Sequence, residues 1–412
     1  MARIGLRLAA GAAASVAVVM AVPALTQQKD SPPIARYTID AGTMSGMAGM
    51  GSRSGLSGAM AMMSGSGGGA MHELQLRLGS SRSVTGEAKA DHFMPKGAGL
   101  SVSVPLTSPK PGTASSGTPG ETRQPEMPKA RLLLYWGCGE HAGPGQPVVI
   151  DFAKIAKGQV PPNLYAAAVS IPEQWRVTQS NSTTFGEWPN AKDTKQVPSN
   201  SSLLGAHRIA SNYAPEISFD LDTDYLAALQ VQSTAQPSGA FAMSWNAIPG
   251  ATGYYAWVMS AKTDRSGQAT DMVWWASSAK QAFGGPMWEW LSPAAVAKLV
   301  AEKTVMPASQ QSCTVPAEVK QSGGDFLMAN MFAYGPQRDF AYPPRPKDPK
   351  LAWKPDWIAR VRYRSNSMVM LGMDMSGMGT SSSQPVSDPS QPPKPKCKGL
   401  AGIAKRAAGL CE

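Results

Sequence analysis

The sequence predicts a mainly β fold, with two antiparallel β-sandwich-like units between low-complexity flanks. Many short segments alternate apolar and polar residues, which is the pattern of a strand with one buried face. Turn-forming residues separate these segments, since the chain holds 41 Gly and 35 Pro among 412 residues. Helical periodicity is rare.

The N-terminus has the pattern of a secretory signal peptide over residues 1–24. Arg3 and Arg7 precede an uncharged stretch from Leu8 to Val22, and small residues follow it. A transmembrane helix needs about 20 apolar residues, and this stretch is shorter. We therefore expect cleavage and a secreted protein, periplasmic or extracellular, with no transmembrane segment after cleavage. Residues 25–71 are rich in Gly, Ser, Ala and Met, which predicts a disordered leader.

The first folded unit is predicted over residues 72–225. Leu74, Leu76 and Leu78 alternate with polar residues in a half-buried strand. The same alternation of apolar and polar residues recurs in short segments that are separated by turn-forming residues, which favours a β-rich domain. The segments expected as further strands are 100–106, 131–136, 147–152, 166–171, 208–213 and 216–221.

The second unit is predicted over residues 226–370. Phe241, Met243 and Trp245 alternate in one strand, a Pro-Gly turn follows at 249–253, and an apolar strand begins at Tyr254. The spacing of Trp245, Ala251 and Tyr254 resembles the B–C strand pair of fibronectin type III domains. That resemblance implies a sandwich with Trp245 between its two sheets.

Three further elements complete this unit and the tail. Ser292 and Pro293 begin a helix near 293–303, inserted into the sandwich. Strands follow at 326–334 and 357–370, and the second carries Arg360, Arg362 and Arg364 in alternation. Residues 371–412 form a low-complexity basic tail with a short terminal helix.

Charge limits the classes of partner. The formal net charge is +10, and residues 345–412 alone carry 12 Lys and Arg against 5 Asp and Glu. A basic tract attracts anionic surfaces, so an envelope polymer, a glycan or another anionic surface is the expected partner of an exported protein. The glycine-rich segments lack the Lys-Ser/Thr pair of a phosphate loop, and no nucleic-acid partner is expected.

The cysteines are typical of an oxidising compartment. Four are present, and an even set in an exported chain predicts disulfides with three possible connectivities. We expect Cys138 with Cys313 and Cys397 with Cys411. Cys138 and His141 are also candidates for a nucleophile and its base, or for two ligands of a metal site, because they lie three residues apart in one loop.

Methionine is concentrated in the two flanks. Of 23 Met, seven lie between 44 and 71 and five between 368 and 378. The candidate ligands are Met44, Met47, Met50, Met373, Met375 and Met378, whose spacing resembles the thioether-rich motifs of exported copper-handling proteins. Soft Cu(I) and Ag(I) favour thioether sulfur. The alternatives are compositional drift and a sacrificial sink for oxidants.

Tryptophans are the second candidate surface. Trp274-Trp275 and Trp288-x-Trp290 lie in or beside the expected helical insertion. Exposed Trp faces can stack on sugars, although most Trp side chains are buried in cores. Adjacent residues of a strand point to opposite faces, so one of Trp274 and Trp275 should point outward unless the helix covers it.

These observations lead to one main hypothesis for function and two alternatives. The main one is an exported, non-enzymatic binding or envelope-associated structural protein of unknown ligand, whose overall texture resembles uncharacterised exported bacterial proteins. The first alternative is a Met-rich periplasmic protein that binds copper or silver. The second is a thiol-dependent enzyme that uses Cys138 and His141. The sequence indicates neither the ligand nor the oligomeric state.

Overall fold

The computed structural model describes residues 30–47, 70–109, 130–155, 157, 159 and 176–372, except 266–268, 283, 325 and 349. The described chain is mainly β, as the sequence predicts. The expected signal peptide, the strand at 166–171, the terminal helix and the Cys397–Cys411 pair lie outside the described residues.

The strands form one large sheet and two smaller ones. The ten-stranded sheet contains, in spatial order, β6 (Val148–Asp151), β5 (Arg131–Trp136), β13 (Ala269–Ala276), β12 (Gly253–Thr263), β16 (Met328–Tyr342), β17 (Trp357–Met370), β1 (Ala35–Gly46), β2 (Met71–Ser80) and β7 (Thr184–Trp188), with β14 (Met306–Pro307) beside β12. The three-stranded sheet contains β10 (Val231–Ala235), β11 (Phe241–Trp245) and β15 (Ser312–Val315). The four-stranded sheet contains β4 (Ser103–Pro105), β3 (Ala90–Phe93), β8 (Gly205–Ser211) and β9 (Ile217–Leu221). The helices are η3 (Lys96–Ala98), α2 (Phe152–Ile155), η4 (Gln179–Asn181), η5 (Gly285–Trp288), α3 (Pro293–Ala301) and α4 (Ala317–Ser322).

Strand β1 corrects the expected boundary of the disordered leader. Residues 35–46 were predicted as part of that leader, yet they form a strand between β17 and β2. β1 runs parallel to β17 and antiparallel to β2. Its composition is poor in large apolar residues, but Tyr37 and Ile39 are fully buried on one face. Pairing with β17 and β2 supplies the backbone hydrogen bonds of this strand. The low-complexity sequence contains no local signal of that pairing.

The large sheet also crosses the expected boundary between two units at residue 225. Strands β1, β2, β5, β6 and β7 precede that boundary, and β12, β13, β16 and β17 follow it. The two halves of the chain therefore share one sheet, which differs from the two separate sandwiches predicted. The sequence carried no sign of this, because strand pairing between distant segments leaves no local signal.

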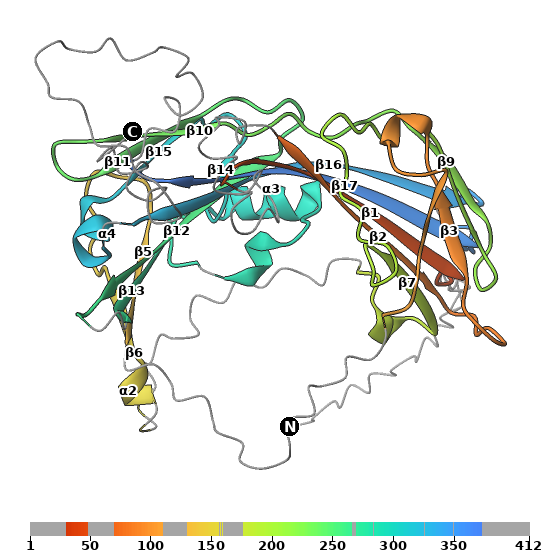
Figure 1. Ribbon diagram of the computed structural model, residues 1–412, viewed down its shortest axis with the longest axis horizontal. Helices are drawn as coiled ribbons and strands as arrows, with labels where there is room; N and C mark the ends of the chain where they lie inside the picture. Colours follow the sequence, from red (N-terminus) through yellow and green to blue (C-terminus); the bar gives the residue numbers. More distant parts are fainter. Residues whose placement is uncertain are drawn as a thin grey trace, which may run out of the picture.

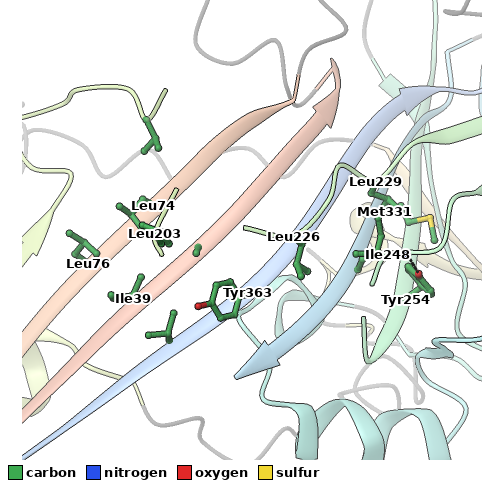
Figure 2. Close-up of a cluster of buried hydrophobic side chains, with 14 of the residues drawn as sticks. Ile39, Leu74, Leu76, Leu203, Leu226, Leu229, Ile248, Tyr254, Met331 and Tyr363 are labelled. Carbon is green, nitrogen blue, oxygen red and sulfur yellow. Dashed lines mark hydrogen bonds between the residues drawn. The ribbon is translucent and has the colours of Figure 1, made fainter. Parts of the chain in front are cut away.

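The main hydrophobic core covers one face of the large sheet. Apolar side chains of β1, β2, β16 and β17 point to this face and meet residues from the connections between strands (Figure 2). Figure 2 shows, for example, Leu226 and Leu229 of the segment before β10 lying over Tyr363 and Met331. The two smaller sheets and these connections complete the cover of this face.

The opposite face of the large sheet is covered in part by α3. Figure 1 shows α3 below the central strands, between the two ends of the sheet, which bend downward in this view. The helix begins where the sequence predicts, because the Ser292 side chain accepts a hydrogen bond from the Ala295 amide at 3.2 Å. Val296 and Leu299 pack with Tyr255, Phe332 and other aromatic side chains of β12 and β16. No helix of the described residues is long and apolar enough to cross a membrane.

Trp245 is buried, with 6% of its surface exposed. It lies in β11 of the three-stranded sheet, and its ring centroid is 5.6 Å from that of Tyr254 in β12 of the large sheet. The side chain therefore fills space between two sheets. The relation to fibronectin type III domains and the insertion of α3 into such a sandwich stay predictions.

Candidate functional site

A charged ladder occupies the part of the sheet face that α3 leaves free. Asp40 of β1 lies directly opposite Arg362 of β17, and its carboxylate is fully buried. The Arg362 guanidinium donates two hydrogen bonds to it, from Nε at 2.7 Å and from Nη2 at 2.9 Å. Arg77 of β2 donates a third from Nη1 at 3.0 Å. A buried carboxylate is tolerated only when charges and hydrogen bonds satisfy it, and here two arginines do so.

The ladder continues along the next pairs of the strands. Arg77 Nη2 donates to Gln75 Oε1 at 2.6 Å, and Gln75 Nε2 donates to Glu73 Oε1 at 2.7 Å. Glu73 Oε2 in turn accepts from Arg364 Nη2 at 3.2 Å. The five side chains and Arg362 thus form one connected network across three strands. Such a network holds each guanidinium in a defined orientation.

The end of η5 and the residues that follow it close one side of this network. The Trp290 carbonyl accepts a hydrogen bond from Arg362 Nη1 at 2.8 Å, and the Trp288 carbonyl accepts one from Arg364 Nη1 at 2.7 Å. The Arg364 guanidinium also stacks over the Trp290 ring, 3.9 Å from its centroid. A Cβ at Gly42 would meet the Trp290 ring at 3.1 Å, so glycine lets the indole approach the sheet.

The network forms the floor of a cavity of about 380 Å³, which we call the arginine cavity. Four arginines line it, together with Trp288, which is 37% exposed. Its lining residues are Gln75, Arg77, Arg176, Val177, Thr178, Trp288, Glu289, Trp290, Arg362 and Arg364. Arg176 forms an ion pair with Glu289. Arg364 Nε is buried and has no hydrogen-bond partner among the described residues.

A second cavity of about 550 Å³ shares Gln75 and Arg77 with the arginine cavity. It extends along β2 toward the start of that strand, where Met44 and Met71 line it. The two cavities therefore adjoin at Gln75 and Arg77.

The predicted loop site at Cys138 has another role in the structure. Cys138 is disulfide-bonded to Cys313, and the described residues contain no free cysteine. The bond ties the loop after β5 to β15, as the sequence predicts for this pair. His141 Nδ1 lies 3.1 Å from Glu318 Oε1, and its side chain is 68% exposed. The structure thus lacks the thiol that the enzyme alternative requires.

The predicted methionine site is described only in part. Met44 lies in β1 and Met47 just after it, both half-buried. Met50, Met373, Met375 and Met378 lie outside the described residues. Within the described part of the chain, no group of three or more His, Cys, Asp or Glu side chains could hold a metal ion.

The tryptophans separate as the strand pattern requires. Trp275 is fully buried in the main core, while Trp274 points to the other face and stacks on Trp288, with ring centroids 5.6 Å apart.

Sequence reasoning did not single out the residues of the charged ladder. The alternation of Arg360, Arg362 and Arg364 is visible in the sequence. Asp40, the partner of Arg362, lies in a segment that the sequence predicts to be disordered.

The comparisons with known proteins give no family for this chain. No model of a known protein family matches it, and no curated protein is significantly similar to it.

Proposed function

We propose that this chain is an exported, non-enzymatic binding protein and that its ligand, an acidic saccharide from an envelope polymer or glycan, occupies the arginine cavity. The observation that carries the proposal is that four arginines and Trp288 line one cavity. Its volume of about 380 Å³ lies in the range of small-molecule sites, roughly 300–1,000 Å³.

The charges favour a ligand with one negative group. Four arginines line the cavity, and the carboxylates paired with them are Asp40, Glu73 and Glu289. Four positive and three negative charges leave a net charge of +1. A monoanion such as a uronic acid residue would balance it, and a guanidinium presents two parallel N–H donors to a carboxylate. Trp288 lines the cavity and is 37% exposed, so part of its indole is available for contact with a sugar ring.

Export and the absence of catalysis are parts of the same proposal. The N-terminal pattern of Arg3, Arg7 and the apolar stretch after them supports export. The Cys138–Cys313 disulfide is consistent with an oxidising compartment. Because Cys138 is disulfide-bonded, binding is favoured over thiol chemistry.

Calorimetric titration of the purified protein with galacturonate and with uncharged galactose tests the proposal. We expect saturable binding of galacturonate and none of galactose. The variant Arg77→Gln/Arg176→Gln should weaken that binding, while Asp40 remains paired with Arg362 and the fold is kept. Arg208→Gln is the matched control, since Arg208 lies in β8 and pairs with Glu216 at 3.2 Å. Equal binding of both sugars, no binding, or an equal loss in the control would contradict the proposal.

A further inference from the structure

The second cavity is lined by a carboxylate that forms no ion pair with any described residue. Glu187 lies in β7 directly opposite Arg77 of β2, and both residues line this cavity. Residues directly opposite each other in an antiparallel pair share a face, and opposite charges in such positions usually interact. The Arg77 guanidinium instead donates to Asp40 at 3.0 Å and to Gln75 at 2.6 Å. The Glu187 carboxylate has neither an ion-pair nor a hydrogen-bond partner within the described part of the chain.

The other charged side chains of the second cavity are already paired. Glu73 forms an ion pair with Arg364, and the Lys195 Nζ atom lies 3.6 Å from a carboxylate oxygen of Asp193. The arginine of this lining is the one that also belongs to the arginine cavity, where its charge has been counted. One negative charge, that of Glu187, is therefore left over in the second cavity.

The second cavity has the size and the mixed lining of a site for one sugar ring. Its volume of about 550 Å³ lies in the range of small-molecule sites, and Met44 and Met71 offer apolar contacts. Two buried nitrogens of lining residues, His72 Nδ1 and Trp188 Nε1, have no hydrogen-bond partner among the described residues. Buried polar atoms without partners are rare, and a bound ligand or water is one explanation. Burial lowers the pKa of His72, so this side chain adds no charge at pH 7.

The two adjoining cavities carry opposite excess charges. The arginine cavity has a net charge of +1, and the second cavity adds the negative charge of Glu187. A ligand that spans both cavities matches these charges when one unit has a carboxylate and the next unit has an ammonium group. Joining the two units also strengthens binding, because the second contact is then intramolecular.

We infer that the second cavity binds a protonated amino sugar, whose ammonium group donates hydrogen bonds to the Glu187 carboxylate. The full ligand is then a saccharide in which an amino sugar with a free amine is linked to an acidic sugar. This description of the full ligand rests on the proposed function, whereas the ammonium site itself does not. An ammonium group has three N–H donors, and its bonds to a carboxylate are charge-assisted. An N-acetylated amino sugar lacks that charge.

Titration of the full-length protein with glucosamine at pH 7 tests the ammonium site, and N-acetylglucosamine is the uncharged counterpart. The tryptophans are labelled with fluorine, because Trp188 lines the second cavity and Trp288 lines the arginine cavity. Single Trp→Phe variants assign the two resonances. We expect glucosamine to shift the Trp188 resonance in a saturable manner, both without galacturonate and after saturation with it. N-acetylglucosamine should leave that resonance unchanged.

A matched pair of variants tests the role of the carboxylate. Glu187→Gln keeps the size of the side chain and removes its charge, so it should weaken glucosamine binding by about tenfold, the effect of losing a charged hydrogen bond. Its affinity for galacturonate should not fall. Glu216→Gln is the control, because Glu216 pairs with the exposed Arg208 at 3.2 Å outside both cavities. A thermal melt of each variant verifies the fold.

The outcomes separate this inference from the proposed function. No glucosamine binding, equal binding of N-acetylglucosamine, displacement of galacturonate by glucosamine, or full affinity in Glu187→Gln would overturn the ammonium site. Binding of glucosamine at Trp188 without any binding of galacturonate would support the ammonium site and contradict only the proposed function.

Discussion

The imidazole rings of His92 and His207 lie side by side in the core, with His92 Nε2 2.9 Å from His207 Nδ1. His207 Nε2 must donate its proton to the Leu203 carbonyl, 2.7 Å away, because a carbonyl only accepts. Its Nδ1 then accepts from His92 Nε2, and His92 Nδ1 accepts from the Tyr37 hydroxyl at 2.7 Å. This chain joins β1 of the large sheet to β3 and β8 of the four-stranded sheet, and His207 can accept from His92 only while its own Nδ1 carries no proton.

The first prediction concerns the effect of acid on these histidines. Burial lowers the pKa of His92 well below its usual value and lowers that of His207, although the Leu203 bond and Asp220 act in the opposite direction on His207. Below about pH 6.5 the unfolded chain therefore binds more protons than the folded one, so the free energy of unfolding decreases as the pH is lowered. We expect a loss of about 1.4 kcal/mol per pH unit for each histidine until the pH reaches its folded pKa. Urea unfolding between pH 7.5 and 5 measures this slope.

The control for that experiment is His141→Gln, because the His141 side chain is 68% exposed. This variant should keep the acid sensitivity of the parent. The double variant His92→Gln/His207→Gln should lose most of the slope. An equally steep slope in the double variant would show that other groups cause the acid sensitivity.

The second prediction concerns the buried carboxylate of the charged ladder. Asp40→Ala leaves the Arg362 guanidinium, whose side chain is 6% exposed, without its counter-charge. Breaking a buried pair by removing one partner costs about 3–5 kcal/mol. Denaturant unfolding measures the change. Asp271→Ala, which breaks the bond to the exposed Arg131, should cost much less, and an equal loss in both variants would contradict the role of burial.

The third prediction concerns Trp245 between the sheets. Trp245→Ala should cost about 3–5 kcal/mol, since it removes a large buried side chain and leaves a cavity beside Tyr254. The unfolding free energy from denaturant titration tests this. Trp288→Ala, at a partly exposed position, serves as the comparison and should cost less. Full stability of the Trp245 variant would mean that the described packing is wrong.

The fourth prediction concerns the thiols. Mass spectrometry of the unreduced, alkylated protein should find a peptide that links Cys138 to Cys313 and no alkylated Cys138. The variant Cys138→Ala/Cys313→Ala should lose about 2–5 kcal/mol, because the bond closes a loop with a sequence separation of 175 residues. Quantitative alkylation of Cys138 in the parent would restore the Cys138–His141 enzyme alternative.

Local patterns were enough to predict several elements. Strands β5 and β17 have the same bounds in the structure as in the sequence-based expectation, Arg131–Trp136 and Trp357–Met370. The start of α3 was visible in its capping serine and first-turn proline. The pattern was less accurate at Val102, which is 83% exposed although Leu100 and Val104 on either side are buried. Alternation predicts a face, but it does not show where a strand begins.

By itself the sequence determined the β class and the positions of several strands, because these depend on local periodicity, whereas the cysteine count left three possible pairings and the structure shows Cys138 bonded to Cys313. Only the tertiary structure decided which strands pair and therefore which side chains meet. Asp40 and Arg362 are 322 residues apart, and the parallel register of β1 and β17 places them in contact. Pairing of distant strands is set by the packing of whole sheets, which leaves no signal within either segment.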